Sequence, residues 1–195
     1  MTEVFGRSNS GKTQLAMQTA LLSAKVGAKC LFIDTEGSFR PERVAEMAKA
    51  RGWDLDGLLE QIVYVRSDSA SEQMETIRRM PGRAATASCR VVVVDTLTRN
   101  FSVELPGMSN LSSRQGELDV HLSEMARDAW LNERAYLLTN RVTFGTTRDV
   151  GIGGRTVDQL VGASMMLERV SGKVKAVLIS TGRSVLADLG AAGID

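Results

Sequence analysis

The stretch Gly6-Arg7-Ser8-Asn9-Ser10-Gly11-Lys12-Thr13 decides the fold of this chain. It matches the pattern GxxxxGK[ST] at every fixed position, and it stands between a short predicted strand (residues 3–5) and a predicted helix (residues 12–26). Backbone N–H groups in such a turn, together with the helix N-terminus, surround phosphate groups. The stretch therefore predicts a phosphate-binding loop in which Lys12 reaches the β- and γ-phosphates and Thr13 ligates Mg²⁺. The alternative, a glycine-rich turn with an incidental lysine, requires two glycines, the lysine and the hydroxyl to coincide by chance.

Composition narrows the class of protein. The chain has 195 residues, of which 43% are hydrophobic and 24% charged, so it is globular rather than disordered. Its net charge of +1 excludes a protein that coats nucleic acid by bulk charge, so any nucleic-acid site is a local patch.

The sequence has no apolar run long enough for a membrane span and no signal peptide. Cys30, Cys89 and His121 lack metal-site spacing, and we expect His121 to be structural and the protein to be soluble and cytoplasmic.

Hydrophobic periodicity predicts strands that alternate with helices. The alternation indicates one α/β domain over residues 1–195 with a mainly parallel sheet, closed by antiparallel C-terminal strands. Residues 98–113 and 143–156 show no clear period and are expected to be loops. The predicted strands are residues 29–34, 61–65, 90–95, 135–140, 164–169, 173–180 and 184–189, and the predicted helices are residues 41–51, 69–80 and 114–132.

Two acids follow buried strands and are candidates for chemistry on a bound nucleotide. Asp95 closes the run RVVVVD and is placed to hold the metal with its water shell. Glu36 lies two residues after Asp34, which ends another buried strand, so its carboxylate can face the γ-phosphate and orient or deprotonate water. A strand-ending acid in a turn is the alternative for Asp95, and a solvated loop acid is the alternative for Glu36.

The order of several stretches resembles the ATPase core of the RecA/RadA recombinases, above all their archaeal and eukaryotic branch. The resemblance covers essentially the whole chain, and residues 34–44 (DTEGSFRPERV) discriminate this family from other proteins with a P-loop. The stretches are TEVFGRSNSGKTQLA (2–16), LFIDTEGSFRPERV (31–44), RVVVVDTLTRNF (90–101), RQGELDVHLSEMARDAW (114–130) and TNRV (139–142). The resemblance implies a three-layer, RecA-like P-loop NTPase fold that binds ATP and Mg²⁺.

The resemblance also implies roles for individual residues of the nucleotide site. Glu36 corresponds to the catalytic base of the family, and Lys12 joins it in catalysis. Arg43 falls on an arginine that packs against adenine, although it could instead pair with Glu42 or Glu46. The expected metal residues are Thr13 and Asp95. The expected nucleotide-binding residues are Gly6, Ser8, Asn9, Ser10, Gly11, Lys12, Thr13, Gln14, Arg43 and Arg141.

In this family two loops bind single-stranded DNA, and they correspond by position to residues 98–113 and 143–156. The first begins with Arg99, and the second contains Arg148 and Arg155 among glycines. Basic loops of this kind suit binding that follows phosphates without reading sequence. The alternative is a pair of solvated loops with ordinary arginines.

The chain also departs from the family. Arg141 stands where recombinases usually have a glutamine that senses the γ-phosphate, so this guanidinium either clamps phosphate or contacts DNA. We expect no separate N-terminal DNA-binding domain, and the sequence contains no Phe-x-x-Ala motif of the kind recombinases use to polymerise. Both features resemble the archaeal RadA paralogues of the RadB type.

These observations favour an ATP-hydrolysing recombinase paralogue that binds single-stranded DNA and assists homologous recombination and DNA repair. Its expected partners are the main RadA-type recombinase or other repair proteins, with self-association possible and a nucleoid-associated location. Two alternatives stay open, and the near-neutral charge supports the first of them. One is a signalling or clock-type RecA-fold ATPase that binds no DNA. The other is a module that uses nucleotide as a structural support and regulates the recombinase.

Overall fold

A central sheet runs through the computed structural model, which describes residues 1–144 and 149–195. The strand order is β10-β9-β8-β1-β5-β4-β2-β3. All pairs from β8 to β3 are parallel, and β9 is antiparallel to both of its neighbours. The strands are β1 (Thr2–Gly6), β2 (Cys30–Asp34), β3 (Ile62–Arg66), β4 (Val91–Asp95), β5 (Ala135–Asn140), β8 (Ala163–Val170), β9 (Lys173–Leu178) and β10 (Ser184–Ala187). The predicted parallel sheet with antiparallel C-terminal strands is confirmed.

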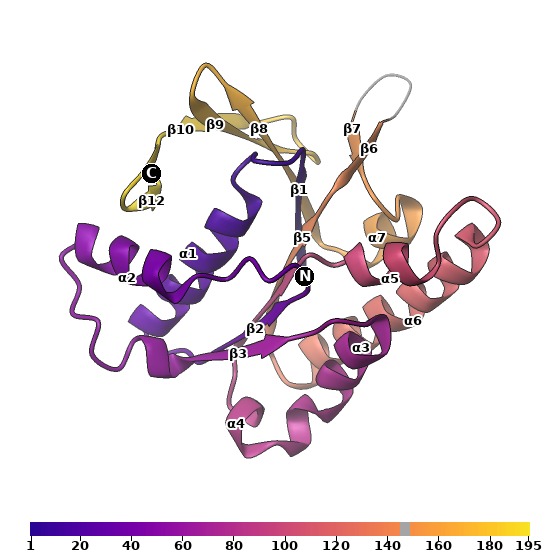
Figure 1. Ribbon diagram of the computed structural model, residues 1–195, viewed down its shortest axis with the longest axis horizontal. Helices are drawn as coiled ribbons and strands as arrows, with labels where there is room; N and C mark the ends of the chain where they lie inside the picture. Colours follow the sequence, from indigo (N-terminus) through magenta and orange to yellow (C-terminus); the bar gives the residue numbers. More distant parts are fainter. Residues whose placement is uncertain (145–148) are drawn as a thin grey trace.

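Helices cover both faces of this sheet, so the molecule has three layers (Figure 1). One face carries α1 (Lys12–Lys25) and α2 (Pro41–Ala50). The other carries α3 (Ala70–Arg79), α5 (Arg99–Glu104), α6 (Leu111–Leu131) and α7 (Arg155–Leu160). The short elements η1 (Leu59–Gln61), η2 (Met80–Gly82) and α4 (Ala84–Ala87) lie in the connections.

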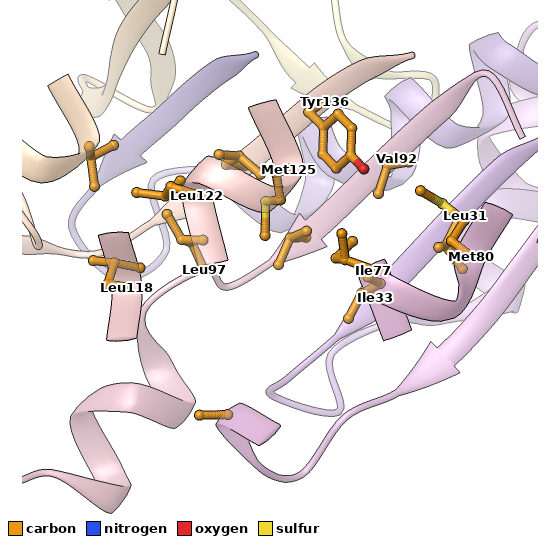
Figure 2. Packing of buried hydrophobic residues seen from close by; sticks show 14 of the residues in the cluster. Leu31, Ile33, Ile77, Met80, Val92, Leu97, Leu118, Leu122, Met125 and Tyr136 are labelled. Carbon is orange, nitrogen blue, oxygen red and sulfur yellow. The ribbon is translucent and has the colours of Figure 1, made fainter. Parts of the chain in front are cut away.

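Strand β2 shows how the sequence produces the two covered faces. Successive side chains of a strand point to opposite sides. Leu31 and Ile33 accordingly pack with α3 and α6 in the cluster shown in Figure 2, whereas Cys30 and Phe32 pack with α1 and α2. All five residues of β2 are buried, which explains why its sequence is a continuous apolar run rather than an alternating one.

The segment 98–113 was expected to be a loop, and that expectation is wrong in part. It contains the helix α5, and α6 begins at Leu111 rather than at residue 114. A helix of six residues is too short to display a hydrophobic period. It is instead held by tertiary contacts, because Phe101 is buried and Asn100 donates to the carbonyl oxygens of Ser67 and Ser69.

The described residues of the segment 143–156, which was also expected to be a loop, form strands and a helix. Strand β6 (Val142–Phe144) pairs antiparallel with β7 (Asp149–Gly151), and α7 begins at Arg155.

A second small hairpin, β11 (Leu189–Gly190) with β12 (Gly193–Ile194), lies against α1 near the C-terminus (Figure 1). Gln18 of α1 holds it by bonding both the N–H and the carbonyl of Ile194.

The expected cap of α3 is confirmed. The hydroxyl of Ser69 accepts a hydrogen bond from the N–H of Glu72, which is the predicted cap of α3. In the described part of the chain, no helix combines the length and the apolar character that crossing a membrane requires.

Candidate functional site

The loop between β1 and α1 needs glycine at both ends. A Cβ atom on Gly6 would collide with the carbonyl oxygen of Leu167 on the neighbouring strand β8. Gly11 has φ = +104°, a left-handed conformation that glycine adopts without strain, and it leads directly into α1. The two glycines of the motif therefore permit the close packing and the turn that aim the loop's backbone at a ligand.

Lys12 lies across this loop. Its Nζ donates to the carbonyl oxygens of Gly6 (2.9 Å) and Arg7 (2.8 Å). Burial lowers the pKa of the Lys12 ammonium, while the nearby carboxylates of Asp95 and Glu36 raise it. The cation is thus held next to the loop by neutral carbonyls, which an anionic ligand can replace.

Asp95 ends β4 beneath the loop, and hydroxyls surround it. Its carboxylate accepts hydrogen bonds from Ser38 (3.0 Å), from Thr139 and from Thr13. Burial raises the pKa of Asp95, and these three hydrogen bonds lower it. The sequence-predicted pair of Thr13 and Asp95 is therefore in direct contact.

Glu36 is positioned by the neighbouring acid Asp34. Asp34 is fully buried at the end of β2, and its carboxylate accepts from the N–H groups of Glu36 (3.0 Å), Gly37 (2.7 Å) and Phe39 (2.9 Å). These bonds set the turn that carries the Glu36 side chain toward the loop. Thr96 Oγ1 then donates to Glu36 Oε1 at 2.9 Å.

Arg141, the residue immediately after β5, contacts Glu36 directly. Its Nη2 and Nε lie 2.8 and 3.1 Å from Glu36 Oε1. The side chain of Arg141 is 56% exposed and that of Glu36 28%, so the ion pair lies at the rim of the site and not in the core.

A cavity of about 860 Å³ joins these groups. Of the residues predicted for the nucleotide and metal site, Ser10, Asp95 and Arg43 do not line it. Ser10 and Asp95 are buried, and Arg43 bonds Glu46 and the C-terminal hairpin. Its lining is Gly6, Arg7, Ser8, Asn9, Gly11, Lys12, Thr13, Gln14, Met17, Glu36, Thr96, Arg141, Val142, Arg169 and Leu189. Sequence reasoning missed Arg7, Met17, Thr96, Val142, Arg169 and Leu189.

Arg169 illustrates why some lining residues were missed. It lies two residues beyond Leu167, which is the register partner of Gly6 on β8. The sequence contains no signal that β8 pairs with β1, because the two strands are far apart along the chain. Arg7 and Thr96, by contrast, are adjacent to residues that the motifs had already marked.

Arg43 has partners of its own. Its guanidinium donates to Glu46 (3.0 Å), to Gln14 (2.8 Å) and to the carbonyl oxygen of Gly190 (2.6 Å) in the C-terminal hairpin. The alternative pairing with Glu46 is therefore present, and Arg43 joins α2 to α1 and to β11. Contact of Arg43 with adenine stays a prediction.

Comparison with models of protein families identifies the family to which this chain belongs. The model of the Rad51 family matches residues 1–185. The chain belongs to the Rad51 family. The family match and the three-layer arrangement together establish a RecA-like fold of the recombinase ATPase class.

The two segments that this Rad51-family chain was expected to use for DNA come together around a second cavity. This cavity of about 630 Å³ lies among α5, α6, the β6–β7 hairpin and α7. Arg155 lines it, as does Arg114, a residue that sequence reasoning did not single out. Arg99 does not line it and bonds its neighbour Asn100 (3.2 Å). Arg148 lies outside the described residues.

Asn140 connects the two cavities of this Rad51-family chain. Its Oδ1 accepts from Thr98 Oγ1 (2.7 Å) and from the N–H of Arg141 (2.9 Å). Its Nδ2 donates to Glu3 Oε1 (2.8 Å) and to the carbonyl oxygen of Ile152 (2.7 Å). One buried side chain thus fixes the backbone of Arg141, the start of α5 and the end of the β6–β7 hairpin.

The oxygen donors present suit Mg²⁺. Among the described residues, no three His, Cys, Asp or Glu side chains form a metal-binding group. Mg²⁺ in nucleotide sites usually takes one or two protein oxygens and completes its shell with waters and phosphates. The Thr13 hydroxyl and the Asp95 carboxylate, already in contact, match that requirement.

Proposed function

We propose that this chain binds ATP with Mg²⁺ at the Gly6–Thr13 loop and hydrolyses it. The observation that carries the proposal is a convergence at one edge of the sheet. Lys12, Thr13, Asp95, Glu36 and Arg141 follow the carboxyl ends of the adjacent strands β1, β5, β4 and β2, where open α/β sheets bind ligands.

ATP would take the place of the carbonyl oxygens that now hold Lys12. The N–H groups of the loop and the N-terminus of α1 would surround the phosphates, with Lys12 at the β- and γ-phosphates. Thr13 and Asp95 would hold Mg²⁺, which supplies charge neutralisation at the phosphate oxygens. Ser8, Asn9, Ser10, Gly11 and Gln14 complete the proposed site, with Arg43 toward the base.

Glu36 is the proposed general base. It would accept a proton from the water that attacks the γ-phosphorus, while the bond from that phosphorus to the β-phosphate oxygen breaks. ADP and inorganic phosphate leave, and the proton is then released to solvent. The hydrogen bonds that the Asp34 carboxylate accepts from the N–H groups of Glu36 and Gly37 set the turn and support this role, because a base must lie within reach of its water.

Single-stranded DNA is the proposed second ligand. Arg99, Arg148 and Arg155 would contact its phosphates from the segments that follow β4 and β5. Arg114 shares a cavity with Arg155 and extends the proposed basic surface. The Asn140 hydrogen bonds support coupling of ATP and DNA binding, because they join the residue beside the γ-phosphate position to both DNA segments.

The finer biological role is also a proposal. We propose a recombinase paralogue of the RadB type, built on residues 1–195 as one core, that assists recombination and repair beside a RadA-type recombinase. The substitution of the sensing glutamine by Arg141 supports a role distinct from that of the main recombinase.

An ATPase assay on the purified protein, with and without single-stranded DNA, tests this function. We expect Mg²⁺-dependent turnover that changes when DNA is added. Lys12→Ala removes the charge that meets the β- and γ-phosphates and should abolish binding or turnover, whereas Lys49→Ala, an exposed lysine on α2, should not. A protein that does not bind DNA, and whose ATPase rate does not change when DNA is added, would instead be a signalling ATPase. A protein that binds ATP without hydrolysing it would be a regulatory module.

A further inference from the structure

The ion pair between Arg141 and Glu36 places a cation on the group that hydrolysis needs. Arg141 donates two bonds and Thr96 one, and all three reach the same oxygen, Glu36 Oε1. A carboxylate oxygen offers about two lone-pair sites, so three hydrogen bonds on Oε1 leave it no ready site for a water molecule. In the structure, Oε1 of the proposed base is therefore occupied by Arg141 and Thr96.

The partners come from different parts of the chain and are free to separate. Glu36 and Arg141 are 105 residues apart and lie in the connections after β2 and β5. The guanidinium is more than half exposed, so it can reorient without opening the core. An exposed pair of this kind contributes little stability, which makes it easy to exchange for a stronger anion.

The cavity offers such an anion a place beside the pair. Arg141 and Glu36 line the same cavity as Lys12 and Thr13. Arg141 is also close enough to Lys12 to lower the pKa of that ammonium. A triphosphate held by Lys12 would bring its terminal phosphate toward Arg141, and a diphosphate would leave that position without charge.

We propose that Arg141 is a positioning residue that exchanges partners when ATP binds. It holds Glu36 in the nucleotide-free protein, and the γ-phosphate draws the guanidinium away and leaves the carboxylate available to water. ADP lacks the third phosphate and leaves the pair intact. Arg141 thereby ties activation of the base to a triphosphate, which the neutral glutamine of related recombinases cannot do through an ion pair. This inference rests on the proposed function, because it assumes ATP at the Gly6–Thr13 loop.

Affinities for two probes, ADP and a non-hydrolysable ATP analogue, measured by calorimetry with Mg²⁺, test the exchange. Arg141→Gln should weaken the analogue by about tenfold relative to ADP, the scale of a lost charge-assisted hydrogen bond. Glu36→Gln should strengthen the analogue by about two- to fivefold, because no ion pair has to be broken. The same Glu36→Gln change should have a smaller effect when Arg141 is already glutamine. Arg127→Gln, an exposed arginine on α6 across the sheet, is the matched control and should change neither affinity.

The results separate this proposal from the proposed function. If the unaltered protein binds neither probe, the nucleotide site itself is wrong. If it binds both, but Arg141→Gln changes the two affinities equally, the exchange is refuted while the ATP site stands. An equal effect of Glu36→Gln with and without Arg141 refutes it as well. Unchanged ATP preference with reduced DNA affinity in Arg141→Gln would assign Arg141 to the DNA surface instead.

Discussion

Asn140 Nδ2 donates a hydrogen bond to Glu3 Oε1 at 2.8 Å, and both side chains are almost completely buried between β5 and β1. Burial raises the pKa of Glu3, and the hydrogen bonds from Asn140 and Ser164 lower it. An acid inside a sheet is tolerated only when its oxygens are satisfied. The Nδ2 group of Asn140 thus satisfies the buried carboxylate of Glu3. Its Oδ1 holds Thr98 and the N–H of Arg141 beside the nucleotide site.

Asn140→Ala should destabilise the fold. Glu3 and the carbonyl oxygen of Ile152 would each lose a donor, and one buried polar group without a partner costs about 1–3 kcal/mol. Urea denaturation should therefore show a loss of unfolding free energy of at least that size. Asn110→Ala, which removes an exposed hydrogen bond to Pro106, should change it by less than about 0.5 kcal/mol. Equal losses in the two variants would show that the Asn140 network is not needed for stability.

Glu36→Gln should separate ATP binding from turnover. Glutamine keeps the shape of the side chain and the bond from Thr96 but cannot accept a proton from water. We expect ATP still to bind while hydrolysis slows by about 10²-fold or more. Single-turnover assays measure this, with Glu60→Gln, an exposed acid in η1, as the control. A parallel loss of binding and turnover would indicate that Glu36 supports the fold or the metal rather than the chemistry.

His121 should make the protein sensitive to acid. It is fully buried on α6 beside Gln73 and Phe101, and burial, with a smaller effect of Arg78, lowers its pKa from 6.5 to about 3. Between those values the unfolded chain binds a proton that the folded protein does not, so the unfolding free energy falls as the pH falls.

The contribution of His121 to this slope is at most about 1.4 kcal/mol per pH unit. Glu3 and Asp95 act in the opposite direction, because burial raises the pKa of each and the folded state then binds the proton more readily. The difference between the unaltered protein and His121→Gln isolates the histidine. Identical slopes in urea denaturation between pH 6.5 and 4 would rule out this source of acid sensitivity.

DNA binding, as proposed, should be local and electrostatic. Replacing Arg148 and Arg155 together by alanine should weaken single-stranded DNA binding and reduce the slope of log affinity against log salt by about one to two units. Arg90→Ala provides the control, since this arginine precedes β4 at the opposite edge of the sheet and bonds Asn132. Unchanged affinity and slope in the double variant would place any DNA site elsewhere.

Much of the fold could be predicted because its signals are local. The Gly6–Thr13 loop is one contiguous motif, and its glycines, lysine and threonine act through the backbone of the same eight residues. The buried strands and the Ser69 cap were equally readable, because strand period and capping depend on residues two to four positions apart. Asp95 and Glu36 could be named for the same reason, as each follows a buried strand.

What the sequence by itself determined is therefore the α/β class, the phosphate-binding loop and the acids near it. Only the tertiary structure decided that Arg141 lies on Glu36, that Asn140 satisfies Glu3, and that α5 forms where no period was visible. Those contacts join residues from 31 to 137 positions apart or rest on packing against other elements. A local sequence pattern cannot predict these contacts. The order of the strands in the sheet depends on how the whole chain buries its apolar faces.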